Sequence, residues 1–147
     1  MKTINKDIVY SGYFKINLLK IENFNNDIIH REQLSSDDAV AALVYNTDTE
    51  NFIFVKQFRV GSEDCMIEIP AGKIDVKGMS TEKIYLFYVE VSNKIEKGGG
   101  VDTEEIEVIE ISEQELYDKF NLGYFIDGKT IMTIQDWIIN YKSQDIL

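Results

Sequence analysis

The chain has 147 residues, of which 44% are hydrophobic and 12% aromatic, and its 26 acidic and 15 basic side chains give a formal net charge of −11. This length predicts one domain that buries roughly two-thirds of its unfolded surface, and the composition excludes a disordered acidic tail. The negative charge disfavours nucleic acid as a partner, and the single cysteine excludes an intramolecular disulfide or a zinc cluster.

The N-terminal residues show no apolar run of the signal-peptide type. No later stretch is apolar over the length that a membrane span requires. We therefore expect a soluble, cytoplasmic protein that does not bind a membrane.

The N-terminal region is predicted to be a β-hairpin extension. Residues 8–22 favour half-buried strands, because Phe14, Ile16 and Leu18 alternate with polar side chains. Turn-forming residues at 23–27 lead into another short strand at 28–32. We expect residues 1–34 to form this extension and residues 35–147 to form the core of a single domain.

The middle of the chain is predicted to be mainly strands. Apolar runs at 39–45 and 52–55 flank a polar turn, which is typical of a buried hairpin, and a short strand around Glu68 stops at Pro70. Residues 84–91 are apolar on both faces and predict an interior strand covered by a layer on each side. A further strand is expected at 106–111.

The C-terminal third is predicted to contain two helices. Ser112 and Glu115 form a capping box that opens the first helix. The second should dock on the core through Ile131 and Trp137. Its residues at helical spacing are Ile131, Ile134, Ile138 and Tyr141. The order of elements predicts a single α/β domain of the α+β type with a mixed sheet.

Two features could carry chemistry. Carboxylates are concentrated at residues 102–107, after Gly98-Gly99-Gly100. They either bind Mg²⁺ or act as a general base, or they form a solvated acidic loop. Arginine is so sparse that Arg31 and Arg59 are candidate bidentate phosphate binders, the alternative being a surface role.

Three single residues have simpler interpretations. Cys65 is predicted to be a small core residue, and the lone His30 gives no basis for a catalytic triad. The run Asp127-Gly128-Lys129-Thr130 precedes a helix, which indicates either a turn and helix cap or a phosphate contact by Lys129.

The string Glu68-Ile69-Pro70-Ala71-Gly72-Lys73-Ile74-Asp75, with 55–59 before it, resembles the approach to the catalytic box of Nudix hydrolases. It is similar to the branch that splits nucleoside diphosphate sugars, the ADP-ribose and GDP-mannose pyrophosphatases. Other landmarks of that branch follow in order over nearly the whole chain, at 11–14, 30–32, 98–101, 104–108 and 127–130. The segments 98–101 and 127–130 look more like the GDP-mannose type.

This resemblance implies a Nudix-like α/β/α sandwich, a nucleoside diphosphate sugar as ligand, and a homodimer built through the N-terminal strands. The positions that match substrate contacts are Tyr13, His30, Arg31, Glu32, Arg59, Ala71, Gly72, Lys73 and Lys129. The implied cofactor is Mg²⁺, with the carbonyl of Ala71 and the carboxylate of Glu104 as ligands. Glu104 is also the implied catalytic residue.

The defining box of the family, GX5EX7REUXEEXGU, is missing from this chain. It should begin at Gly72, but Gly78 stands where its first glutamate is expected, and no Arg-Glu-apolar-any-Glu-Glu string occurs. We therefore predict that the catalytic helix and the strand after it have been removed as a block near residues 75–80. In the complete family such glutamates hold Mg²⁺, which activates water for attack on the phosphoanhydride.

Three functions follow as hypotheses. The first is a pyrophosphatase, active or formerly active, that yields a nucleoside monophosphate and a sugar phosphate, with activity lost or much reduced here. The second is an inactive sugar-nucleotide-binding or regulatory dimer that keeps Arg31, Arg59 and Lys129 as phosphate contacts. The third is a truncated product without a function, which would unfold with poor cooperativity.

Overall fold

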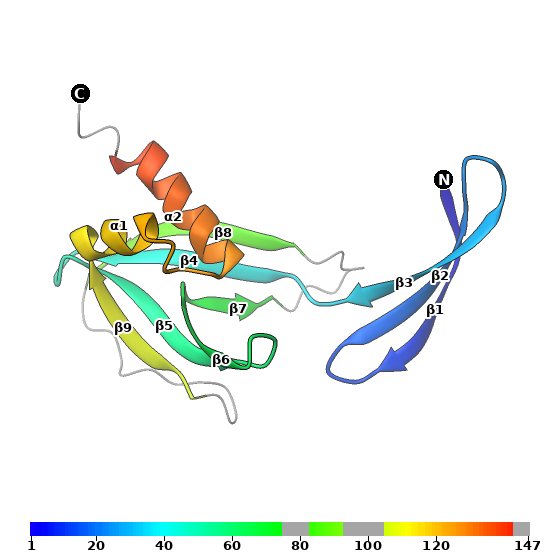
Figure 1. Cartoon of the computed structure of the whole chain (residues 1–147), viewed down its shortest axis with the longest axis horizontal. Coiled ribbons are helices and arrows are strands. Elements are labelled where there is room, and N and C mark those ends of the chain that lie inside the picture. Colours follow the sequence, from blue (N-terminus) through cyan, green and yellow to red (C-terminus); the bar gives the residue numbers. More distant parts are fainter. Residues whose placement is uncertain (75–82, 93–104, 143–147) are drawn as a thin grey trace. The chain divides into compact units, whose positions relative to one another are not determined.

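A computed structural model describes residues 1–74, 83–92 and 105–142 of the chain (Figure 1). The chain divides into two compact units: unit 1 is Met1–Ala39 with Lys73–Lys83, and unit 2 is Val40–Gly72 with Ile84–Leu147. The strands are β1 Lys2–Ser11, β2 Lys15–Glu22, β3 Ile28–Ser35, β4 Ala39–Asn46, β5 Asn51–Arg59, β6 Asp64–Glu68, β7 Ala71–Lys73, β8 Ile84–Val91 and β9 Glu107–Ser112. The helices are α1 Glu113–Asn121 and α2 Gly128–Asn140.

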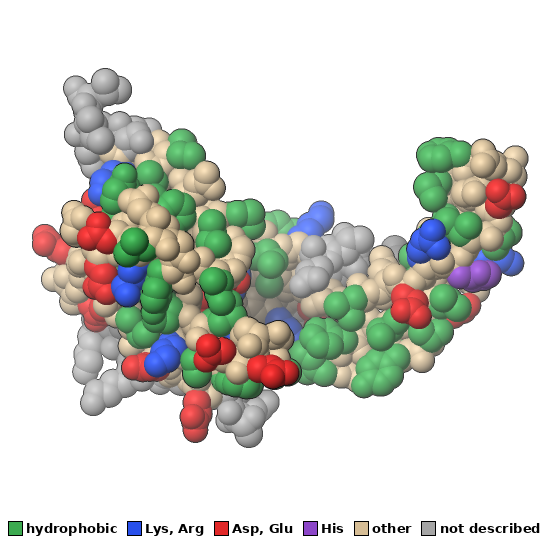
Figure 2. All heavy atoms as spheres, viewed as in Figure 1, with side chains coloured by type: hydrophobic (Ala, Val, Ile, Leu, Met, Phe, Trp, Pro, Cys, Tyr) green, Lys and Arg blue, Asp and Glu red, His purple; other side chains and the backbone are tan. Residues whose placement is uncertain are grey.

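Unit 1 is built on an antiparallel sheet with the strand order β1-β2-β3. The predicted N-terminal β extension is therefore present, with β1 as a strand that begins at Lys2. Asn17 in the central strand is the one buried residue of these three strands. Hydrophobic side chains lie on the surface of unit 1 (Figure 2), among them Ile8 in β1, Phe14 in the turn between β1 and β2, and Leu34 in β3.

In unit 1, Asp38 accepts hydrogen bonds from two residues that come much later in the chain, and we call this contact the junction at Asp38. The N–H of Ile74 donates to the Asp38 carbonyl at 2.7 Å, and the N–H of Lys83 donates to Asp38 Oδ1 at 3.0 Å. The N–H of Ala39 donates to the Lys83 carbonyl at 2.8 Å. The predicted removal near residues 75–80 lies between Ile74 and Lys83 and outside the described residues.

Unit 2 is built on a mixed sheet in which β5 is central. β4 and β5 form a hairpin that pairs Asn46 with Asn51, and β6 and β9 both run antiparallel to β5. β8 pairs with β4. Since Ala39 donates to Lys83 and Thr47 donates to Val91, the β4 and β8 residue numbers rise together, which indicates a parallel pair. The predicted mixed sheet of an α+β fold is confirmed.

The core of unit 2 lies between this sheet and the two helices, which lie on the same side of the sheet (Figure 1). Phe52 packs edge-on against Trp137, with 4.8 Å between ring centroids, and Phe54 stacks on Phe125 at 5.3 Å. Ser112 caps α1 and accepts a hydrogen bond from the N–H of Glu115, as predicted. Among the described residues, no helix is both long and apolar enough to cross a membrane.

Two predictions about burial are wrong. The strand Ile84–Val91 was predicted to be covered on both faces, but Leu86 and Tyr88 pack on the core while Tyr85 and Phe87 on the opposite face are exposed. The reason is that the helices cover only one side of β8. Cys65 was predicted to be a core residue, but it is exposed, because the β5–β6 hairpin extends beyond the core at that point.

Candidate functional site

A buried carboxylate in unit 2 brings together two of the predicted substrate residues. Glu68, the last residue of β6, is 1% exposed. Its Oε1 accepts from Arg59 Nε at 2.5 Å, and its Oε2 forms an ion pair with Lys129 Nζ. Lys129 also pairs with Asp127 Oδ1 at 2.9 Å. We call Arg59, Glu68, Asp127 and Lys129 the Glu68 cluster; its two cations and two carboxylates cancel in formal charge.

The N-terminus of α2 fixes the position of Lys129. Asp127 is the N-cap, and its Oδ2 accepts from the N–H of Thr130 at 2.9 Å and from the Thr130 hydroxyl at 2.6 Å. The same hydroxyl oxygen accepts from the N–H of Ile69 at 3.0 Å, which ties the helix to the end of β6. The predicted turn and cap at 127–130 are confirmed, and they place Lys129 beside Glu68.

The Asp127 carboxylate is stabilised as an anion. Burial by itself raises the pKa of Asp127, but the hydrogen bonds from Thr130 and Lys129 outweigh it and lower the pKa below its ordinary value of 3.8. The unfolded chain therefore binds this proton more tightly than the folded chain does. The resulting stabilisation is complete above pH values near 3.8 and is lost as the pH falls through the lower pKa of the folded state.

Asp127→Asn is expected to lower the free energy of unfolding by about 1.5 kcal/mol at pH 7, because asparagine caps as well as aspartate but carries no charge for Lys129. The difference from the wild type should shrink once the pH falls below 3.8. Urea unfolding at pH 7, 5, 4 and 3 measures it. A difference that stays constant over this range would contradict the assignment.

The other residues that were predicted to contact substrate include several in unit 1, and these lie on its surface. Tyr13 is in the turn between β1 and β2, and Lys73 Nζ lies over its ring, 4.4 Å from the centroid. His30, Arg31 and Glu32 are consecutive exposed residues of β3, so Arg31 points to the opposite face from the other two. Unit 1 therefore brings Tyr13 and Lys73 together.

The implied metal ligands find little support in the described residues. Ala71 and Gly72 are exposed in β7, whereas Glu104 lies outside the described residues. Within residues 1–74, 83–92 and 105–142, no three Asp, Glu, His or Cys side chains are placed to hold a metal ion. The carboxylates of Glu68 and Asp127 are already engaged by cations. The described residues alone supply no complete ligand set for Mg²⁺, and we derive no step that uses this ion.

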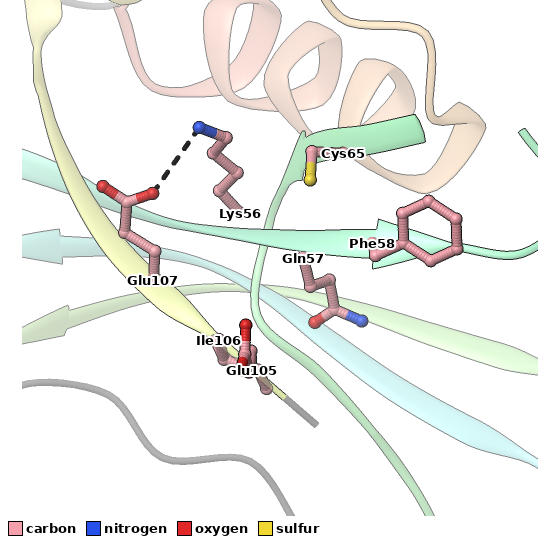
Figure 3. Close-up of a pocket in the computed structure, with 7 residues that line it drawn as sticks. All are labelled: Lys56, Gln57, Phe58, Cys65, Glu105, Ile106 and Glu107. Carbon is pink, nitrogen blue, oxygen red and sulfur yellow. Dashed lines mark ion pairs between the residues drawn. The ribbon is translucent and has the colours of Figure 1, made fainter. Parts of the chain in front are cut away.

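A surface groove of about 440 Å³ lies over β5, β6 and β9 (Figure 3). Lys56 and Glu107 form an ion pair at 3.6 Å in this groove. Its lining residues are Lys56, Gln57, Phe58, Cys65, Glu105, Ile106 and Glu107. None of the predicted substrate contacts is among them, but the Gln57 side-chain amide lies within hydrogen-bond distance of the Arg59 guanidinium, so the groove adjoins the Glu68 cluster.

The sequence interpretation missed Glu68 as a site residue. A glutamate between Ile67 and Ile69 in an apolar strand is a usable signal, because a buried carboxylate needs charged or hydrogen-bonding partners. The ion pair of Asp127 with Lys129 was also missed, although the cap was predicted. Only the fold shows that residues 59, 68 and 129 meet, since they are far apart in sequence.

Comparison with known proteins supports the resemblance found in the sequence. No family model matches the chain. The chain is 25% identical to the GDP-mannose pyrophosphatase of Cronobacter sakazakii over 181 aligned positions, covering 90% of this chain and 95% of that protein. It is 27% identical to the GDP-mannose pyrophosphatase of Salmonella typhimurium over 176 positions, covering 90% and 92%.

A solved structure described as an ADP compounds hydrolase has a similar fold, with a TM-score of 0.69, 13% identity, and coverage of 99% of this chain and 96% of that one. The resemblance to Nudix nucleoside diphosphate sugar pyrophosphatases is confirmed. Nine tenths of 147 residues is about 132, so roughly 50 of the 181 positions aligned with the Cronobacter protein have no counterpart here. The chain is therefore shorter than this relative over the aligned region, and the removal of one block near residues 75–80 stays a prediction.

Proposed function

We propose that this protein binds nucleoside diphosphate sugars, such as GDP-mannose or ADP-ribose, through Arg59 and Lys129, with phosphoanhydride hydrolysis lost or much reduced. The observation that carries the proposal is the convergence of these two cations on Glu68. Arginine and lysine are the side chains that proteins use to contact phosphate groups. The similarity to GDP-mannose pyrophosphatases over nine tenths of the chain supports the ligand class.

The reduced activity is proposed from the sequence. The chain contains no Arg-Glu-apolar-any-Glu-Glu string, so the glutamates that would bind metal in that string are missing. The two metal ligands that we still propose are Glu104 and the Ala71 carbonyl. Two oxygen ligands compete poorly with the hydration shell of Mg²⁺. An inactive sugar-nucleotide-binding or regulatory protein is the second candidate, and it shares the same ligand contacts.

The test is incubation of the pure protein with GDP-mannose or ADP-ribose, with and without Mg²⁺, followed by measurement of nucleoside monophosphate and of ligand binding. We expect saturable binding with little or no product. Substantial turnover that Glu104→Gln abolishes would overturn the loss of activity and favour a working pyrophosphatase. No binding of either compound would overturn the proposed function.

We also propose a homodimer built through the N-terminal strands. Ile8 in β1 is exposed on the same face of the sheet β1-β2-β3 as its partner Asn17, whereas the exposed Leu34 lies on the opposite face, and a three-stranded sheet needs a covered apolar face for stability. Asn17 Nδ2 and Gln33 Oε1, on paired residues, are buried and have no hydrogen-bond partner among the described residues. A second copy of the chain would cover this surface.

Light scattering at micromolar concentration is expected to give twice the 17.0 kDa of one chain. Ile8→Asp should shift the mass toward the monomer, because it places a charge in the apolar interface. Phe24→Ser is the matched control, since Phe24 is exposed in the turn between β2 and β3. A wild-type protein that is monomeric at this concentration would contradict the dimer.

A further inference from the structure

Glu68 sets the spacing between two cations that come from different elements. Arg59 is the last residue of β5, and Lys129 lies in the first turn of α2. Each cation contacts a different oxygen of the same carboxylate, which is 1% exposed. A buried carboxylate in this position has few rotamers available, so it holds the guanidinium and the ammonium close to each other.

Both cations keep hydrogen-bond donors for a second anion. Of the five N–H groups of Arg59, Nε–H is used by Glu68. The Gln57 side-chain amide oxygen lies 2.6 Å from Nη1 and 2.8 Å from Nη2 and accepts one N–H of each, so two N–H groups of the 40% exposed side chain are left for a ligand. Lys129 has three N–H groups, of which Glu68 and Asp127 take two. Its side chain is 12% exposed, so only a small part of it is accessible to a ligand.

The Glu68 cluster is formally neutral, which limits its general attraction for anions. At such a site, the relative affinity for different phosphate compounds therefore depends on where the N–H donors of Arg59 and Lys129 are placed. A diphosphate presents two charged groups and can contact both cations, whereas a monophosphate has one group to share between them.

We propose that Glu68 is a positioning residue that holds Arg59 and Lys129 in place for the two phosphates of a diphosphate, an inference that rests on the proposed function. In this way Glu68 makes the site bind diphosphates more tightly than monophosphates. Simple electrostatics predicts the opposite effect for its removal. If Glu68 only neutralised the cations, then Glu68→Gln would leave one net positive charge and tighten the binding of every phosphate compound.

Glu68→Gln is therefore the informative variant, because the glutamine oxygen can accept from one cation but its amide group repels the other. We expect the wild type to bind GDP-mannose at least about tenfold more tightly than GMP, and Glu68→Gln to lose about tenfold in affinity for GDP-mannose with little change for GMP. The measurement is isothermal titration of both compounds at pH 7 and 25 °C in buffer with EDTA. Glu115→Gln is the control on α1 and should match the wild type.

If circular dichroism shows that Glu68→Gln does not fold, Glu68→Asp is used as the test variant instead. It keeps the charge but withdraws the carboxylate by one methylene, so it cannot reach both cations, and we expect the same loss of preference. A general loss of structure would weaken the binding of both compounds equally, and that result would overturn the positioning role.

Unchanged or tighter GDP-mannose binding by folded Glu68→Gln would also overturn the positioning role, while wild-type binding would leave the proposed function standing. A wild type that binds neither compound would overturn both. The two proposals therefore fail in distinguishable ways.

Discussion

Glu68→Gln is expected to lower the free energy of unfolding by about 3 kcal/mol at pH 7. Loss of one partner from a buried ion pair typically costs about 3–5 kcal/mol, because the remaining charge is left without compensation. The lower end applies here, since Lys129 keeps Asp127 at 2.9 Å and the Arg59 side chain is 40% exposed. Urea unfolding followed by circular dichroism measures the difference.

Glu107→Gln is the matched control for this prediction. It makes the same chemical change in an ion pair, but the pair with Lys56 is 3.6 Å long and both side chains are exposed. Exposed pairs contribute at most about 1 kcal/mol, so this variant should stay within that range of the wild type. Equal effects of the two substitutions would contradict the structural role of Glu68.

Phe52→Ala is expected to be at least as destabilising, with a loss of about 3–5 kcal/mol in the free energy of unfolding. Phe52 is fully buried at the centre of the core and contacts Tyr45 and Trp137, with ring centroids 5.0 and 4.8 Å away. Truncation removes the transfer free energy of the ring and leaves a cavity under α2. Thermal or urea unfolding of the variant measures the loss.

Phe58→Ala on the same strand is the control for the core substitution. Phe58 is 59% exposed and lines the surface groove, so its truncation should cost less than about 1 kcal/mol. Because the two phenylalanines share β5, the comparison isolates burial from strand propensity. Similar losses for both would mean that the groove side of β5 is packed more tightly than the structure indicates.

Local patterns in the sequence predicted most elements of unit 2. The bounds of β8 agree with the apolar run at 84–91, and the cap of α1 follows from Ser112 and Glu115. Such features depend on neighbouring residues, which the sequence shows directly. Burial depends on what packs against an element, and for this reason the exposed face of β8 and the exposed Cys65 were predicted wrongly.

The candidate site was predictable only in part. Arg59 was singled out because arginine is sparse and Lys129 because it precedes a helix; the resemblance then implied both as substrate contacts, which remain predictions. The carboxylate that joins them was overlooked, because a single charged residue in a strand does not reveal its partners. Long-range ion pairs such as Glu68 with Lys129 arise from the packing of α2 against the end of β6, which no local pattern encodes.

The junction at Asp38 has a consequence for how chains of this type gain and lose segments. Ile74 and Lys83 both donate hydrogen bonds to Asp38, so a segment inserted between them forms a loop whose two ends are already held together. The entropic cost of closing such a loop grows only with the logarithm of its length, and lengthening it by roughly 50 residues would cost about 2 kcal/mol. The loss or gain of a block of that size between Ile74 and Lys83 is therefore expected to change the free energy of unfolding by only this small amount.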